Sequence, residues 1–283
     1  MIDEKISAIL QSPDDGTPIS INLKSEGGIQ YEQTESGILI LDSSKKRPMD
    51  VVYNHPMFQQ WDSIVNERIQ YYTENKTVAG RLANLSYKSM DRFNNRKDTD
   101  FLLDIGCGDG AQIKRLHDKS TYIGIDRNME RLEILKKNYP EATCIYADAA
   151  ALPFKTGSIP FIYSSNAFEH LWYLKEAVLE CYRCTYQTGE AVIIIPTEGG
   201  LWNLGRRVFS KPHFQKKHPA IDFELISHIE HNNVAPQVIR ILETFFKTKC
   251  SYLPFRIPSI YTNALVEIVC THSTDPKMRF KID

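Results

Sequence analysis

The chain has 283 residues, with 34 Lys plus Arg against 35 Asp plus Glu, so its net charge is −1. This balance excludes the global basic field that drives nonspecific binding to nucleic acid, and we expect no nucleic-acid partner. No apolar run approaches the roughly 20 residues that span a bilayer, so we expect no membrane insertion. A chain of this length can bury one large core with a small appendage.

The six cysteines indicate reduced thiols in a cytoplasmic protein, because most lie inside apolar stretches and the N-terminus resembles no secretion signal. The Cys181-x-x-Cys184 pair is expected to be buried rather than redox-active or metal-binding. It falls within a predicted helix, and the chain contains no second pair.

The chain divides into four parts by pattern. Residues 1–48 alternate in polarity between glycine-containing turns, which predicts a small β-hairpin module. Residues 49–98 are polar and helix-prone and form a helical lead-in, in which Tyr71 and Tyr72 are more typical of core packing than of a substrate site. Residues 99–272 form the main domain, and residues 273–283 form a tail.

The main domain alternates strand-like and helix-like segments, the pattern of a parallel sheet with helices on both faces. Residues 197–234 interrupt this alternation with glycines, aromatic residues and a basic run, and this insertion is expected on the acceptor side. The predicted helices cover 111–118, 129–138, 169–187 and 236–246. The predicted strands include 122–125, 143–147, 161–165, 191–196, 250–253 and 265–269.

Residues 101–110 join an apolar strand to a glycine-rich turn at Gly106, Gly108 and Gly110. Such a turn brings the backbone close to a ligand. Polar residues also follow the next predicted strands, and ligands of open α/β sheets bind outside the carboxyl ends of the strands. We therefore expect one crevice to collect the polar residues Asp104, Asp126, Asp148 and Asn166.

Two cofactor classes fit this turn. Gly106, Gly108 and Ala111 formally match the dinucleotide fingerprint G-x-G-x-x-G/A. However, Asp104 and Asp109 would repel a diphosphate. The same carboxylates suit a cationic cofactor without phosphate, such as S-adenosylmethionine with its sulfonium and amino groups.

Several motifs occur in an order that resembles the class I S-adenosylmethionine-dependent methyltransferases, over roughly residues 99–272. They are Leu103-Asp104-Ile105-Gly106-Cys107-Gly108-Asp109-Gly110, Ile123-Gly124-Ile125-Asp126, Ala147-Asp148-Ala149 before Leu152-Pro153-Phe154, Asn166-Ala167-Phe168-Glu169-His170-Leu171, and Gly189-Glu190. The resemblance implies a Rossmann-like α/β fold with a mainly parallel seven-stranded sheet and S-adenosylmethionine as cofactor.

The resemblance also implies roles for single residues. Asp104 and the glycine turn would hold the methionine portion, Asp126 the two ribose hydroxyls, and Asp148 with the following amide the adenine edge. The full expected cofactor set is Asp104, Gly106, Cys107, Gly108, Gly110, Asp126, Arg127, Asp148, Ala149 and Asn166.

Three features depart from family patterns. Pro160 replaces an aspartate at the start of the fourth strand, where it costs little. The N-terminal module resembles zinc-ribbon-like modules of some bacterial methyltransferases, but Ser12 and Asp15 stand at the cysteine positions, so no structural zinc is expected. Glu169-His170 resembles the E-x-x-E-H element of metal-assisted O-methyltransferases. Asn166 replaces its first glutamate, and we expect no metal site, although a later histidine such as His213, His228 or His231 could assist one.

His170 is the candidate general base, since imidazole titrates near working pH, and Glu169 could orient it or contact the acceptor. The alternative is a histidine that only caps or packs its helix. The leading function is methyl transfer to a small-molecule or glycan-type metabolite at oxygen. The alternatives are an RNA-base methyltransferase, a non-catalytic cofactor-binding partner protein and a nicotinamide dehydrogenase. The sequence does not determine the oligomeric state.

Overall fold

A computed structural model of the chain describes residues 2–43, 55, 56, 60, 64, 78–97, 100–200, 204, 208, 211–219, 224 and 230–273. The expected tail, Tyr71, Tyr72 and His228 lie outside these residues, as does the junction between the N-terminal module and the helical lead-in. No helix in these ranges is long and apolar enough to cross a membrane.

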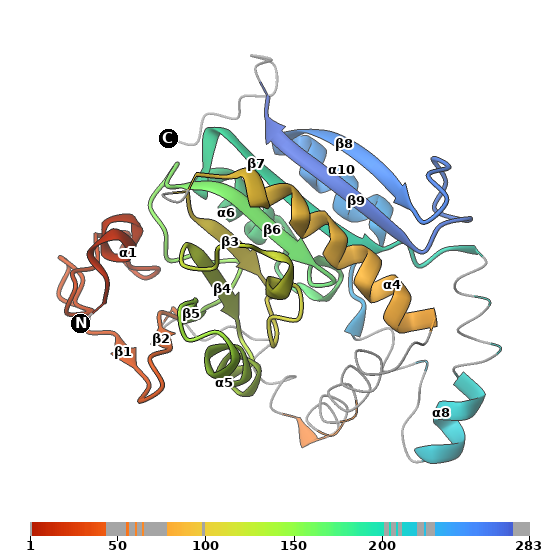
Figure 1. Ribbon diagram of the computed structural model, residues 1–283, viewed down its shortest axis with the longest axis horizontal. Helices are drawn as coiled ribbons and strands as arrows, with labels where there is room; N and C mark the ends of the chain where they lie inside the picture. Colours follow the sequence, from red (N-terminus) through yellow and green to blue (C-terminus); the bar gives the residue numbers. More distant parts are fainter. Residues whose placement is uncertain are drawn as a thin grey trace.

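A nine-stranded sheet forms the centre of the molecule, in the order β1-β2-β5-β4-β3-β6-β7-β9-β8 (Figure 1). Its strands are β1 Glu32–Gln33, β2 Leu39–Ile40, β3 Leu102–Ile105, β4 Tyr122–Asp126, β5 Thr143–Tyr146, β6 Ile159–Ser165, β7 Thr185–Pro196, β8 Phe246–Leu253 and β9 Leu265–His272. The seven strands from β5 to β8 are the predicted α/β sheet. Strands β3 to β7 are parallel, and β9 pairs antiparallel with both β7 and β8.

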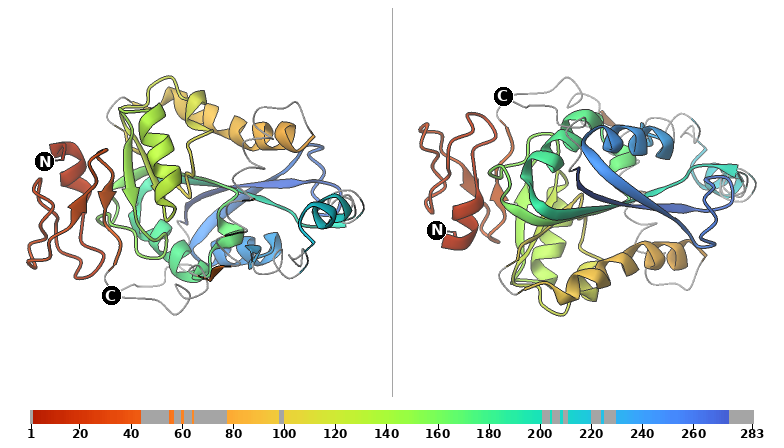
Figure 2. Two further views of the ribbon diagram at one scale, coloured as in Figure 1. Left: turned by 90° about the horizontal axis from the view of Figure 1, so that it is seen from below. Right: turned by 90° about the horizontal axis from the view of Figure 1, so that it is seen from above.

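Helices cover both faces of the sheet (Figure 2). Helices α4 (Val78–Tyr87) and α5 (Met129–Asn138) lie on one face, together with the 3₁₀ turn η1 (Lys88–Asn95). Helices α6 (Leu174–Cys184) and α10 (Ala235–Phe245) lie on the other. Alternate residues of the central strands enter the two cores, as Leu102 and Leu103 do in β3.

The other helical elements for which the structure describes full bounds are short. They are α1 (Glu4–Ile9), α8 (Lys211–Lys217) and the 3₁₀ turns η2 (Ile113–Arg115) and η3 (Phe168–His170). Two predicted helices are therefore shorter in the structure. The 111–118 segment forms only η2, because the Gln112 side chain turns inward to Asp104 and the Cys107 carbonyl. The 169–187 segment divides into η3 and α6, since Asn233 donates to the Phe168 and Leu171 carbonyls at the break.

Strand boundaries also differ from the prediction at two places. Pro160 is the second residue of β6 rather than its first, and the β6–β7 register shifts between Ile159 and Phe161, which accommodates the missing donor. Strand β7 begins at Thr185, where the sequence predicted the end of a helix. Thr185 pairs with Ile159 at this point, and this extra pairing lengthens the strand.

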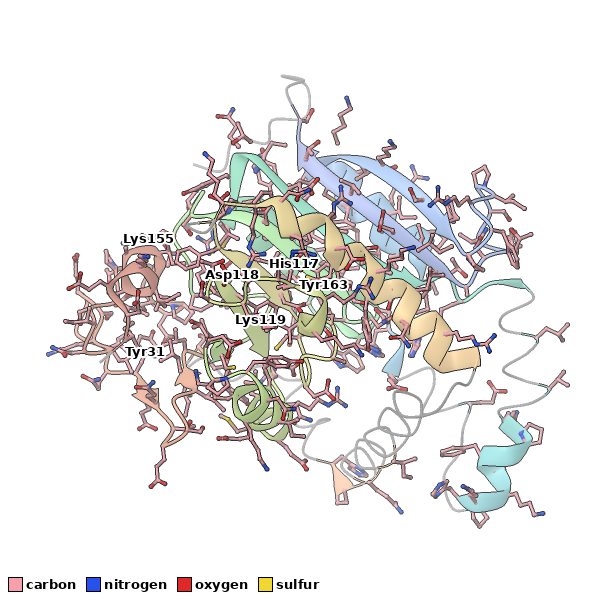
Figure 3. All side chains as sticks on the ribbon, in the orientation of Figure 1. Tyr31, His117, Asp118, Lys119, Lys155 and Tyr163 are labelled. Atoms are coloured by element: carbon pink, nitrogen blue, oxygen red, sulfur yellow. The ribbon has the colours of Figure 1, made fainter. Side chains whose placement is uncertain are left out.

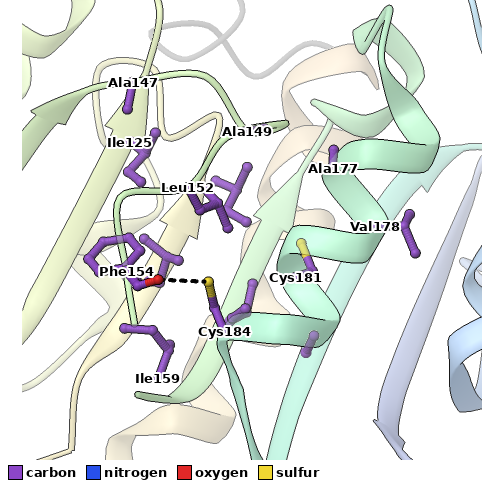
Figure 4. Packing of buried hydrophobic residues seen from close by; sticks show 14 of the residues in the cluster. Ile125, Ala147, Ala149, Leu152, Phe154, Ile159, Ala177, Val178, Cys181 and Cys184 are labelled. Atoms are coloured by element: carbon purple, nitrogen blue, oxygen red, sulfur yellow. Dashed lines mark hydrogen bonds between the residues drawn. The ribbon is translucent and has the colours of Figure 1, made fainter. Parts of the chain in front are cut away.

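Cys181 and Cys184 are buried in α6, as predicted (Figure 4). The Cys184 thiol lies 3.8 Å from the Phe154 carbonyl, and burial raises the pKa of both thiols. Thiolate is the reactive form of cysteine, so these two residues are packing groups.

The N-terminal module is continuous with the main sheet. Strand β2 pairs parallel with β5, and Leu10 bridges Phe154. Lys155 also donates to the Ala8 carbonyl at 2.7 Å (Figure 3). The apolar side chains of the module and of the main sheet form one cluster. The module therefore packs as an extension of the main domain at the β5 edge.

Hydrogen bonds hold the turn at Ser12. The Ser12 hydroxyl accepts the Asp14 and Asp15 amides at 3.3 and 3.2 Å, and it pairs with the Tyr31 hydroxyl at 2.8 Å. Ser25 donates to Asp15 at 3.3 Å. Ser12 and Asp15 are therefore both engaged in hydrogen bonds within the module. Whether the module is related to zinc ribbons stays a prediction.

Replacing Leu10 by Ala is expected to destabilise the whole chain, by about 2–5 kcal/mol. Leu10 is fully buried between the module and Phe154, so the truncation leaves a cavity in the shared core. Urea unfolding followed by circular dichroism measures this as one lowered transition. Ile134→Ala, at a side chain 43% exposed, is the control. A separate early transition of the module with an unchanged main transition would contradict the shared core.

Candidate functional site

The candidate site lies along the carboxyl ends of four neighbouring parallel strands. These strands stand in the order β5-β4-β3-β6, so the loops that follow them share one edge of the sheet. The sequence placed Asp104, Asp126, Asp148 and Asn166 at this edge. Asp126 is the last residue of β4 and Asn166 follows β6, whereas Asp104 lies inside β3, one residue before its end.

The glycine turn curls tightly against its surroundings. Gly106, Gly108 and Gly110 have φ of 71°, 54° and 75°. A Cβ on Gly106 would lie 2.3 Å from the Ala167 side chain. By contrast, a Cβ on Gly108 would have its nearest neighbour at 3.9 Å, so the turn is open at Gly108, where a ligand can approach.

Cys107 contributes its backbone to this turn rather than its thiol. Its amide and that of Gly106 both donate to the Ile125 carbonyl, at 3.0 and 2.8 Å. The side chain is buried, and burial raises the pKa of the thiol well above its usual value. The thiol is therefore neutral and packs inside the fold.

Asp104 is fully buried beneath the turn. Its Oδ2 accepts hydrogen bonds from Gln112 Nε2 at 2.6 Å and from the Tyr122 hydroxyl at 2.7 Å. Its Oδ1 is buried and has no hydrogen-bond partner among the described residues. Burial raises the pKa of Asp104 to about 7, against the lowering effect of these two donors. A cation at Oδ1 would satisfy this carboxylate.

Asp126 is oriented by the backbone. Its Oδ2 accepts the Gly108 amide and its Oδ1 accepts the Asn128 amide, both at 2.8 Å. Desolvation raises the pKa of Asp126, while Arg131 lowers it. Each carboxylate oxygen retains a lone pair for a further donor. This arrangement suits a pair of neighbouring hydroxyls.

Asp148 is linked to the N-terminal module through Arg127. The Asp148 Oδ1 accepts the Ala150 amide at 2.8 Å. Arg127 Nη1 lies 3.6 Å from Asp148 Oδ2, and its Nη2 lies 3.7 Å from Asp42 Oδ2 in the module. Ala149, the residue after Asp148, is buried. No local pattern indicated Asp42, because only the β2–β5 pairing brings it here.

Asn166 has a left-handed backbone, with φ of 54°. Its amide donates to the Ile194 carbonyl at 2.8 Å, and its Nδ2 donates to the Ser165 hydroxyl at 3.1 Å. This conformation is uncommon for a residue with a side chain, and Asn tolerates it better than most. It turns the chain sharply from β6 into η3.

Glu169 and His170 lie in η3, next to this turn. Glu169 is 1% exposed, and its Oε1 lies 3.7 Å from His170 Nε2. Burial raises the pKa of Glu169 to about 7, which His170 partly offsets. His170 Nδ1 lies 2.7 Å from the Glu230 carbonyl. A carbonyl only accepts, so Nδ1 carries the hydrogen and Nε2 keeps its lone pair.

His231 completes a cluster that the sequence only partly indicated. Its ring meets that of His170 edge to face, with centroids 4.8 Å apart. Its Nδ1 contacts the Glu198 carboxylate directly. One ligand atom from each of His170, Glu230 and His231 lies within 4.8 Å of the others.

Asn232 and Asn233 attach this second segment to η3. Asn233 Nδ2 donates to the carbonyls of Phe168 and Leu171, at 3.0 and 2.6 Å, and its amide donates to the Glu169 carbonyl at 3.0 Å. Asn232 Nδ2 donates to the His170 carbonyl at 3.3 Å. The histidine-rich run could be seen in the sequence. The hydrogen bonds that join it to η3, about sixty residues earlier in the chain, could not.

The rest of the predicted insertion is described only in part. Lys211 pairs with Glu224 at 2.7 Å, and Lys216 and Lys217 are exposed at the end of α8. Arg206 and Arg207 lie outside the described residues, as does the side chain of His213. That the basic run contacts the acceptor therefore stays a prediction.

Comparison with known proteins supplies the family. Residues 103–193 match the family model described as "Methyltransferase domain". This segment carries the glycine turn, all three site aspartates and the Glu169-His170 pair.

Residues 103–193 form a methyltransferase domain.

Curated relatives are similar to about a third of the chain or slightly more. A methyltransferase of Schizosaccharomyces pombe, named as uncharacterised, is 28% identical over 109 residues, which is 38% of this chain and 40% of that protein. An uncharacterised protein of Methanocaldococcus jannaschii is 37% identical over 33% of this chain and 36% of its own length. A Mycolicibacterium smegmatis protein named "Probable S-adenosylmethionine-dependent methyltransferase" is 26% identical over 34% and 37% of the two chains. These matches span about two fifths of the relatives' length or less.

Similarity to a solved structure extends over a larger share of the chain. A Thermotoga maritima structure, described as an S-adenosylmethionine-dependent methyltransferase and possible histamine N-methyltransferase, superposes with a TM-score of 0.51. It is 18% identical and covers 77% of this chain and 100% of its own. The chain therefore has the α/β fold of this structure. Both this structure and the Mycolicibacterium smegmatis relative are described as S-adenosylmethionine-dependent.

Proposed function

We propose that the chain transfers the methyl group of S-adenosylmethionine to a hydroxyl of a small-molecule or glycan-type metabolite. The observation that carries this proposal is the Glu169, His170 and His231 cluster beside the cofactor edge. It combines the buried Glu169 carboxylate and the His170 imidazole of η3, which follows β6, with the imidazole of His231 against His170. Such groups take up the proton of a hydroxyl acceptor.

For the cofactor, the geometry supports the assignments that the resemblance implied. The orphan Oδ1 of Asp104 suits the amino group of the methionine portion. The two backbone-held oxygens of Asp126 suit the ribose hydroxyls. Asp148, neutralised in part by Arg127, suits the adenine edge. A hydrogen bond from the cofactor to any of these three carboxylates is charge-assisted, and such a bond is stronger than one between neutral groups.

The proposed reaction is an in-line displacement. The acceptor oxygen attacks the methyl carbon, the carbon–sulfur bond breaks, and its electron pair stays on sulfur as S-adenosylhomocysteine forms. The hydroxyl proton goes to His170 Nε2, whose lone pair is free because Nδ1–H donates to the Glu230 carbonyl. Glu169, 3.7 Å away, stabilises the resulting imidazolium.

The position of the N-terminal module favours this acceptor class over RNA. The module joins the sheet at β5 and reaches Asp148 through Arg127, whereas the cluster follows β6. Strands β4 and β3 separate the two. A substrate-docking ribbon would serve the reaction best near the acceptor, and this module lies at the other end of the crevice.

A labelling experiment tests the proposed function. The full chain is incubated with S-adenosylmethionine carrying a trideuterated methyl group and with a fractionated metabolite extract, and mass spectrometry identifies the products. We expect labelled O-methyl ethers together with S-adenosylhomocysteine. Label found only in added RNA would favour the RNA-base alternative, and cofactor binding without any labelled product would favour a non-catalytic partner protein.

A further inference from the structure

The cluster around His170 has the donor set of a metal site. His170, Glu230 and His231 each offer one ligand atom, all within 4.8 Å of one another. All three are partly buried, which lowers the competition from water without closing the site. Imidazole and carboxylate donors together suit first-row divalent ions such as Zn²⁺ and Mn²⁺.

Both histidines are oriented in the way that metal-bound histidines are. His170 Nδ1 donates to the Glu230 carbonyl at 2.7 Å, and His231 Nδ1 contacts the Glu198 carboxylate. Metal-ligating histidines almost always use the second nitrogen in this way, because the contact sets the tautomer and the ring direction. Each ring is thus left with Nε2 as its ligand atom.

Glu169 supplies a second, independent observation. It is 1% exposed, and its Oε2 has no hydrogen-bond partner in the part of the chain that the structure describes. Its other oxygen faces His170 Nε2 at 3.7 Å. A buried carboxylate oxygen without a donor costs free energy, and a cation between these groups would remove that cost.

The asparagines next to the cluster make the arrangement rigid. Asn233 is 5% exposed and holds the His231 segment to η3 through two side-chain hydrogen bonds and one backbone hydrogen bond. Residues on two elements far apart in sequence are thereby held at metal-ligand spacing before any ion arrives. Such preorganisation is what a specific ion site needs.

We propose that His170, Glu230 and His231, with Glu169 beside them, bind one divalent transition-metal ion next to the cofactor crevice. The inference rests on the proposed function for its chemical role: the ion lowers the pKa of the acceptor hydroxyl, whose proton then leaves to water. With the ion bound, His170 would serve as a ligand; without the ion, it keeps the general-base role proposed above. This differs from the sequence expectation of no metal, which followed from Asn166 and did not include Glu230.

Direct metal binding tests the site without relying on activity. The full chain is freed of metal with EDTA, dialysed, and titrated with CoCl₂ followed by visible absorption and with ZnCl₂ followed by calorimetry. We expect one equivalent to bind. Glu230→Gln and His231→Gln should each weaken binding at least tenfold, whereas His117→Gln, at an exposed histidine outside the cluster, should leave it unchanged.

A second readout guards against misfolding. Each variant is titrated with S-adenosylmethionine, and its circular dichroism is recorded; both should match the unaltered chain. Asn233→Ala should also weaken Co²⁺ binding, since it releases the His231 segment. Absence of saturable binding, or binding that survives both Glu230→Gln and His231→Gln, would overturn the metal site. If S-adenosylmethionine still binds in that case, the proposed function stands with His170 as general base.

Discussion

Replacing His170 by Ala is expected to lower kcat at least about a hundredfold and to leave cofactor affinity unchanged. His170 Nε2 carries the lone pair that faces Glu169. In the proposed reaction this nitrogen takes the acceptor proton or, with a metal ion bound, ligates the ion. The side chain is 34% exposed, so its removal leaves little cavity and the fold should persist. Cofactor titration and turnover under saturating S-adenosylmethionine separate the two quantities.

His117→Ala is the matched control, because His117 is exposed and belongs to neither the cofactor nor the acceptor group. It should keep full turnover. Unchanged turnover in His170→Ala would remove His170 from the mechanism and leave it as a packing residue of η3. An equal loss of cofactor affinity and of kcat would instead show that η3 supports the crevice as a whole.

Replacing Asp104 by Asn is expected to weaken S-adenosylmethionine binding by about 1.5–3 kcal/mol, the usual size of a hydrogen bond to a charged group. Asn keeps the shape of Asp104 and one oxygen for Gln112 or Tyr122, but it removes the charge that the orphan Oδ1 offers to a cation. Calorimetry at pH 8 measures the loss. Glu141→Gln, at an exposed carboxylate outside the glycine turn, is the control and should bind normally.

The pH dependence of binding should also change. Burial raises the pKa of Asp104 from 3.8 to about 7, so the free protein holds this proton below pH 7. A cationic cofactor favours the ionised form, hence affinity should rise with pH up to about 7 and then level. The ionisable groups around Asp104 are Tyr87, Tyr122, Tyr163, Cys107 and Asp126. Asp104→Asn should flatten the profile; an unchanged profile would assign it to another group, such as Asp126.

The same raised pKa has a consequence for the stability of the free protein. The native state binds the Asp104 proton more tightly than the unfolded state does, so its contribution is lost as pH rises from about 4 towards 7. Relative to Asp104→Asn, the unaltered chain should therefore lose free energy of unfolding over this range. Urea unfolding at several pH values measures the difference.

The parallel sheet and its glycine turn could be predicted from the sequence because their signals are local. Apolar runs end in glycine or aspartate, and Met129–Asn138 is the helix that periodicity indicates. The placing of Asp104, Asp126, Asp148 and Asn166 along one edge of the sheet followed from topology alone, since parallel strands end at a shared edge. The structure agrees with these expectations for the fold.

What the sequence missed depends on contacts between distant segments. The Arg127 link to Asp42 exists only because β2 extends the sheet beyond β5. The pairing of His170 with His231 depends on Asn233, whose hydrogen bonds also end the helix that periodicity would have continued back to Glu169. No local pattern reports a contact of this kind.

Calorimetric titration of the full chain with S-adenosylmethionine, S-adenosylhomocysteine and NAD tests the central claim most directly. The acidic crevice built from Asp104, Asp126 and Asp148 should bind the first two ligands at one site and reject the diphosphate of NAD. Saturable binding of S-adenosylmethionine and S-adenosylhomocysteine, with no response to NAD, is the predicted result. Tight NAD binding with no response to the other two would contradict the account.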